Sequence, residues 1–100
     1  MMIAPKEFVQ AMTLPVRQAM AAVRWLEGRV SNTPKPGQAT SAKAALTDAD
    51  CVSQEILLTA LWDRFPGVAL DAEEDTPAVG RFAANDSPQV VRVDPIDGTV

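Results

Sequence analysis

The sequence predicts an α+β fold, because two helical patterns are followed by two short segments that are typical of strands. Apolar residues recur at three- and four-residue steps over residues 14–30 and again over residues 47–64. Segments 68–70 and 90–93 are short, apolar and bounded by turn-forming residues. A chain of 100 residues, 47% of them hydrophobic, has the length and composition of one small domain.

The first helix is predicted over residues 14–30, after a short helical turn at residues 5–12. Pro5 suits the first position of that turn. Thr13 is a favourable N-cap, and Pro15 is tolerated in a first helical turn. The apolar stripe consists of Val16, Ala19, Met20, Val23, Leu26 and Val30. Residues 31–43 hold two prolines, a glycine and many small polar residues, which predicts a loop.

The second helix is predicted from Thr47 to Arg64. Thr47 is a good N-cap, and Asp48 and Asp50 are favourable in the first turn because of the helix dipole. The apolar stripe of this helix consists of Val52, Ile56, Leu57, Ala60 and Leu61. Phe65-Pro66-Gly67 is predicted to end it.

Acidic residues follow both predicted strands. Segment 68–70 leads into an acidic stretch that contains Glu73 and Glu74, and segment 90–93 leads into Asp94. Residues 75–89 between them are expected to be irregular, with one strand near 80–83. Open α/β sheets place ligands at strand ends, and acids that converge there repel one another unless cations neutralise them. Together with Asp50, these acids predict a metal site.

Composition excludes several kinds of chemistry. The chain has no histidine and a single cysteine, so Ser-His and Cys-His catalysis, histidine-ligated zinc and an internal disulfide are all excluded within it. The net charge is −4, and residues 47–100 hold eleven of the thirteen acids, which disfavours nucleic acid as a partner. No run of eighteen apolar residues and no signal pattern is present, so neither a membrane partner nor secretion is expected, and we expect a cytoplasmic protein.

The string Asp-Pro-Ile-Asp-Gly-Thr at residues 94–99 carries the most specific chemistry. Asp94 and Asp97 offer hard oxygen ligands of the kind that Mg²⁺ or Mn²⁺ prefers. Gly98 lets the backbone approach a ligand closely, and a helix beginning at Gly98-Thr99 would direct its free N–H groups at a phosphate. Lys35 or Lys43, from the predicted loop, could also help to hold an anion. The string therefore predicts a metal site beside a phosphate site.

Three motifs in this order resemble the inositol monophosphatase family. They are Leu-Thr-x-x-Asp at residues 46–50, Glu-Glu at 73–74, and the string at 94–99. The resemblance implies a layered α/β sandwich of the inositol monophosphatase and fructose-1,6-bisphosphatase type, with helices on a mostly antiparallel sheet. Members of this family are more than twice as long. Residues 1–100 are therefore expected to be the N-terminal part of a single phosphatase domain whose C-terminal half is absent.

The resemblance also implies site residues and an activity. Glu73, Asp94, Asp97 and the carbonyl of Ile96 resemble ligands of two Mg²⁺ ions, and Glu74 lies where a third, weaker ion or its surroundings would be. The pair Asp50 and Thr99 resembles the residues that activate the attacking water, with Glu73 helping to position it, and the amides of Gly98 and Thr99 resemble the phosphate cradle. The implied reaction is hydrolysis of a phosphate monoester, of the inositol monophosphate type, by metal-activated water.

Three alternatives stay open beside this reading. The string Ala-Glu-Glu-Asp at 72–75 is similar to one in bacterial bisphosphate nucleotidases, which act on 3′(2′),5′-bisphosphates within the same superfamily. The 100-residue chain is expected to be inactive alone, as a metal-binding fragment. A calcium module is disfavoured, because the acids lack the spacing of a helix–loop–helix calcium site. Partners are expected to be a small phosphorylated substrate and, because the family is often dimeric, a second copy of the full-length protein.

Overall fold

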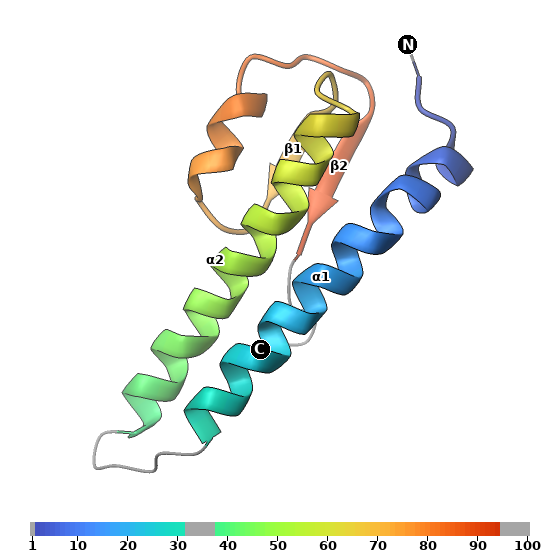
Figure 1. Ribbon diagram of the computed structural model, residues 1–100. Helices are drawn as coiled ribbons and strands as arrows, with labels where there is room; N and C mark the ends of the chain where they lie inside the picture. Colours follow the sequence, from blue (N-terminus) through green and yellow to red (C-terminus); the bar gives the residue numbers. More distant parts are fainter. Residues whose placement is uncertain (1, 32–37, 95–100) are drawn as a thin grey trace.

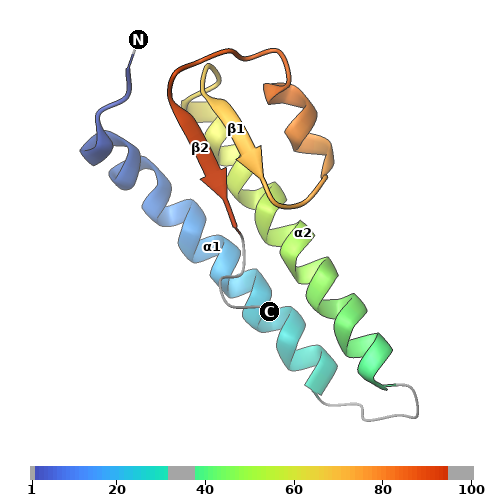
Figure 2. The ribbon, with the colours of Figure 1, turned by 180° about the vertical axis from the view of Figure 1, so that it is seen from behind.

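A computed structural model describes residues 2–31 and 38–94, in which two long helices lie side by side and the strands of a small sheet run along them (Figure 1). Figure 2 shows the two strands lying near the first turns of one helix and the last turns of the other. In chain order the elements are α1 (Pro5–Ser31), α2 (Gln38–Arg64), β1 (Ala69–Ala72), the 3₁₀ helix η1 (Pro77–Phe82) and β2 (Val90–Val93) (Figure 1). The described residues therefore combine helices with a sheet, as the α+β prediction requires.

Helix α1 is continuous from Pro5, so the predicted start at Thr13 is wrong. Pro15 lies inside the helix, where its missing N–H leaves the carbonyl of Ala11 without its usual donor. The Thr13 hydroxyl does not cap the helix but donates to the Val9 carbonyl at 2.6 Å. An interior proline costs a helix about 3 kcal/mol, so packing of α1 against α2 must offset that cost.

The buried face of α1 agrees with the predicted stripe at Ala19 but differs from it elsewhere. Met12 and Ala19 are buried and Phe8 packs against the core, which places the buried face at steps of four and seven residues. Val16 and Met20 belong to the predicted stripe, but they are 43% and 49% exposed. The chain has enough apolar residues on α1 to form two stripes, and periodicity alone does not distinguish them.

Helix α2 begins at Gln38, so Thr47 lies inside it and the predicted N-cap is wrong. Part of the predicted loop is therefore helical, and residues 32–37, which include Lys35, lie outside the described residues. The segment from 38 to 46 is rich in alanine, the best helix former, and can extend the helix alongside α1. The predicted end at Arg64 is confirmed, and the Phe65 amide closes the last turn on the Leu61 carbonyl at 2.7 Å.

Strands β1 and β2 pair in parallel, with Ala69 opposite Val90 and Ala72 opposite Val93. The expectation of a mostly antiparallel sheet is therefore wrong for the two described strands. Residues 73–89 connect them, a length that suits the crossover a parallel pair needs. β2 has the predicted bounds, whereas β1 extends further than the predicted 68–70 and contains Asp71.

The predicted irregular strand at residues 80–83 is wrong, because η1 occupies most of that segment. Phe82 of η1 is buried and meets Trp62 of α2 edge to face, with ring centroids 5.2 Å apart. This contact holds the crossover against α2.

One hydrophobic core joins all five elements. Its buried members are Met12, Leu58, Leu61, Val68, Ala78, Phe82 and Val93. Val93 is the last residue of β2, so the core reaches the strand end that precedes Asp94. Among the described residues, no helix is long and apolar enough to cross a membrane.

Candidate metal and phosphate site

Glu73 and Asp94 lie next to each other where the two parallel strands end. Ala72 and Val93 are opposite each other in the register, and the next residue of each strand is an acid. The Glu73 amide donates to the Val93 carbonyl at 3.1 Å, which extends the pairing by one step and fixes the backbone of Glu73. Figure 2 shows both strands pointing to the same edge. The prediction that two strands deliver carboxylates to one edge is confirmed for this pair.

The two carboxyl groups interact directly. A hydrogen bond with the Asp94 side chain raises the pKa of Glu73, and the negative charge of Asp94 raises it further. Desolvation and the charges of Glu74 and Asp50 act in the same direction. Two carboxyl groups that are close enough to share a hydrogen bond favour a shared proton or a bound cation.

Asp50 faces the same cluster from the middle of α2. Burial raises the pKa of its carboxyl, and the charges of Glu74 and Asp94 add to the effect. Its Oδ1 atom is buried and has no hydrogen-bond partner among the described residues. A buried acceptor without a donor costs free energy, so Oδ1 is suited to a hydroxyl or water that the fold itself does not supply.

Glu74 is held by a residue that sequence reasoning missed. Gln54 of α2 is completely buried, and its Oε1 accepts from the Glu74 amide at 3.1 Å while its Nε2 donates to the Glu74 carbonyl at 2.8 Å. A signal was available, because Gln54 follows Asp50 by four residues and precedes Leu58 by four, on one helix face. A long polar residue in such a row predicts a buried hydrogen-bonding role.

The structure also shows the surroundings of two other side chains near the site, Cys51 and Asp71. The Cys51 thiol is free and partly buried, and burial together with the charge of Glu74 raises its pKa, so it is a weak nucleophile. Asp71 belongs to β1 and pairs with Arg92 of β2 at 3.0 Å. That pair is exposed, and neither residue contributes to the pKa shifts of Asp50 and Glu73.

The rest of the predicted site lies outside the described residues. Ile96, Asp97, Gly98 and Thr99 all fall there, so their roles stay predictions. Within the described ranges, no group of three or more acids or cysteines is arranged to hold a metal ion. The donor chemistry nevertheless fits a hard cation, because the neighbouring groups are carboxylates, and the charges of Asp94 and Glu74 help to raise the pKa values of Glu73 and Asp50.

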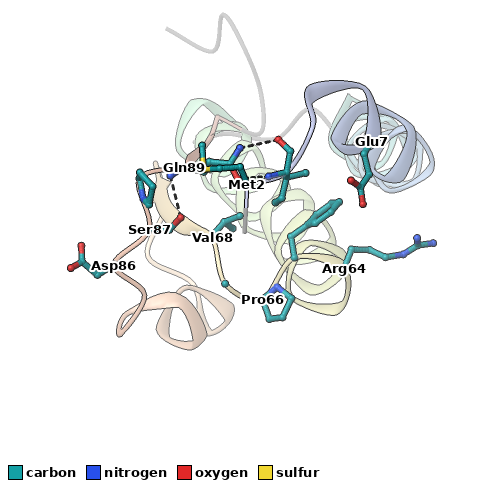
Figure 3. Close-up of a pocket in the computed structure, with 12 residues that line it drawn as sticks. Met2, Glu7, Arg64, Pro66, Val68, Asp86, Ser87 and Gln89 are labelled. Atoms are coloured by element: carbon teal, nitrogen blue, oxygen red, sulfur yellow. Dashed lines mark hydrogen bonds between the residues drawn. The ribbon is translucent and has the colours of Figure 1, made fainter.

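The opposite end of the strand pair has a separate open cavity of about 590 Å³ (Figure 3). Arg64, Glu7 and Asp86 contribute charge to its lining, and Gln89 and Met2 lie beside it. None of the predicted site residues that the structure describes, which are Asp50, Glu73, Glu74 and Asp94, lines it. The cavity and the carboxylate cluster are therefore distinct features of the described chain.

Comparison with known proteins supports the motifs. The model of the inositol monophosphatase family matches residues 8–100. Searches of the curated proteins and of the solved structures found no significant match. The matched range contains every residue predicted for the site, including those after Asp94.

Proposed function

Because the chain belongs to the inositol monophosphatase family, a family of phosphatases, we propose that it serves Mg²⁺-dependent hydrolysis of a phosphate monoester. The observation that carries the proposal is the pairing of Glu73 and Asp94 at the end of the parallel strands. Two carboxyl groups that repel each other at a sheet edge contribute nothing to folding. They are explained by a cation that they bind together.

Glu73 and Asp94 would hold the cation with the Asp97 carboxylate and the Ile96 carbonyl, and Glu74 lies beside them. Bound Mg²⁺ supplies positive charge that acidifies water and neutralises the phosphoryl group. Water attacks phosphorus, the bond to the ester oxygen breaks, and the products are an alcohol and inorganic phosphate. The amides of Gly98 and Thr99 would bind the phosphate oxygens.

Asp50 is proposed to hold a proton during this reaction. Its buried Oδ1 atom would accept the proton of the Thr99 hydroxyl, which in turn orients the attacking water. The raised pKa of Asp50 makes its carboxylate a better proton acceptor than an exposed aspartate. No histidine is needed as a base, and the chain has none.

The substrate is proposed to be a small sugar phosphate of the inositol monophosphate type. The Ala72–Asp75 segment also supports a nucleoside 3′,5′-bisphosphate, because it is similar to the equivalent string of bisphosphate nucleotidases. Both substrates present a phosphate monoester to the same carboxylates. They differ in the group that leaves.

Phosphate release from inositol 1-phosphate and from adenosine 3′,5′-bisphosphate tests the proposal. The assay compares the wild-type chain with Asp94→Asn and with Asp71→Asn, which removes an exposed strand acid outside the cluster. We expect the full-length protein to show Mg²⁺-dependent release that Asp94→Asn lowers at least about a hundredfold and Asp71→Asn leaves unchanged, and we expect none from the 100 residues alone. Cation binding without release from either substrate would favour the metal-binding fragment, and Mg²⁺-independent release would contradict the proposed mechanism.

A further inference from the structure

Gln54 occupies an unusual position, because its polar side chain is fully buried beside the acidic cluster. Its carboxamide makes three hydrogen bonds, and all three reach the segment that follows β1. Two of them join Gln54 to the amide and carbonyl of Glu74, and the third runs from Nε2 to the Thr76 hydroxyl at 2.8 Å. Both hydrogens of the amide group are therefore used.

This arrangement fixes the backbone of Glu74 relative to α2. The paired bonds to one residue resemble those that a neighbouring strand would make, so Glu74 can neither shift along the helix nor rotate away from it. Glu55, the next residue of α2, accepts from the Ala78 amide at 3.0 Å and holds the far end of the same segment. The segment between β1 and η1 is thus attached to α2 at both ends.

Gln54 also connects the acids to one another. Asp50 lies four residues earlier on α2, on the same helix face, so one helix carries both the Asp50 carboxylate and the amide that holds Glu74. Ser53, which lies between them in the sequence, is buried, and its hydroxyl donates to the Asp50 carbonyl at 3.1 Å. A lysine or arginine at residue 54 would neutralise the cluster, whereas a neutral amide holds the acidic segment without changing its charge.

We infer that Gln54 is a positioning residue for divalent cation binding, which keeps Glu73 and Glu74 beside Asp50 and Asp94 against their mutual repulsion. The inference rests on the proposed function, because it assigns Gln54 to the same carboxylate site. Gln54 does not touch the cation. It sets the distance between the carboxylates of the β1 end and those of α2 and β2, so the cation affinity of the site depends on it.

Titration of the full chain with Mn²⁺, followed by electron paramagnetic resonance, tests this inference. Gln54→Met keeps the length of the side chain but removes its three hydrogen bonds. Gln89→Met is the matched control, because Gln89 also bonds twice to backbone, at Ile3, but at the other end of the strands. We expect Gln54→Met to weaken Mn²⁺ binding at least about tenfold and Gln89→Met to leave it unchanged, with both variants folded by circular dichroism.

Wild-type Mn²⁺ affinity in folded Gln54→Met would overturn the inference and leave the proposed function standing, whereas a wild-type chain that binds no Mn²⁺ would overturn both.

If Gln54→Met does not fold, Thr76→Val is the variant that tests the inference, because it removes one of the three hydrogen bonds at nearly constant side-chain volume. Thr59→Val, at an exposed position of α2, is its control. We expect Thr76→Val to weaken Mn²⁺ binding at least about twofold relative to this control, which is one third of the free energy of the tenfold loss for all three bonds, and equal affinities would overturn the inference.

Discussion

The two ends of the β1–β2 pair are closed by the same chemistry but differ in charge. At the amino end, the Asn85 amide donates to the carbonyls of Pro66 and Val68 at 2.6 and 2.8 Å. Gln89 binds the amide and carbonyl of Ile3 there (Figure 3). At the carboxyl end, Gln54 does the same for Glu74. Each end thus uses a neutral amide to satisfy backbone groups that the short strands leave unpaired.

Only the carboxyl end gathers repelling charge. Asp50, Glu73, Glu74 and Asp94 lie at that end. Burial raises the pKa of Asp50 and a hydrogen bond with Asp94 raises that of Glu73, and the charges of neighbouring acids raise both further. The amino end has the same kind of closure without such a cluster, which shows that the fold does not need the acids. A local feature that lowers stability and is not required by the architecture indicates function.

The largest effect is expected from a substitution in the hydrophobic core, which supports both ends of the strand pair. Leu58 of α2 is completely buried in the common core. Leu58→Ala should lower the free energy of unfolding by about 2–5 kcal/mol, because it removes buried methyl groups and leaves a cavity. Urea unfolding followed by tryptophan fluorescence measures the loss. Hydrogen exchange should show both ends losing protection together, and selective opening of one end would contradict a shared core.

Asn85→Ala should affect the amino end alone. It removes two hydrogen bonds, an exposed one to Pro66 and a partly buried one to Val68, so we expect a loss of about 1–3 kcal/mol in the free energy of unfolding. Mn²⁺ affinity should not change, because the substitution lies at the opposite end of β1 from Glu73. A weakened Mn²⁺ site in a folded Asn85→Ala chain would show that the two ends are coupled.

The acidic cluster should make the cation-free chain more stable in mild acid than at neutral pH. The folded-state pKa of Glu73 lies above its unfolded value, so the folded state binds the proton more tightly and stability rises as pH falls through the folded pKa. Asp50 contributes with the same sign. Thermal unfolding midpoints measured from neutral to mildly acidic pH check this. Glu73→Gln should raise the midpoint at neutral pH and flatten its pH dependence; an unchanged profile would contradict the repulsion.

The smallest expected effect concerns the exposed pair between the strands. Arg92 and Asp71 are 83% and 56% exposed, so water and salt screen their attraction. Arg92→Ala should lower the free energy of unfolding by less than about 1 kcal/mol. The loss should shrink further at high salt in urea unfolding experiments. A larger, salt-independent loss would mean that the stem of Arg92 packs on the sheet.

The sequence predicted the ends of helices and strands correctly where a change in the local residue pattern coincides with the end of the element. The bounds of β2 and the end of α2 were predicted, and so was the arrival of Glu73 and Asp94 at one edge. In each case the sequence marks the boundary locally, either by polar residues that follow a short apolar segment or by the Pro66-Gly67 stop.

The errors have a common cause in the packing of α1 against α2. Thr13 and Thr47 are good N-caps in isolation, but each lies inside a helix that continues through it. Contacts along the full length of a helix pair outweigh the contribution of about 1 kcal/mol from a cap. The spacing of Gln54 on the helix could have indicated its burial, but not its partners, because they come from residues 74–76 and a hydrogen bond across twenty residues leaves no local pattern.

The contact between Ile3 and Gln89 spans 86 residues, nearly the whole chain, and it constrains the order of folding. During synthesis the first residues leave the ribosome long before Gln89 exists, so the first turn of α1 stays without this partner while α2 and β1 are made. Contacts of such high sequence separation form late because closing a long loop costs entropy. The start of α1 is therefore expected to be the last part of the chain to dock and the first to open.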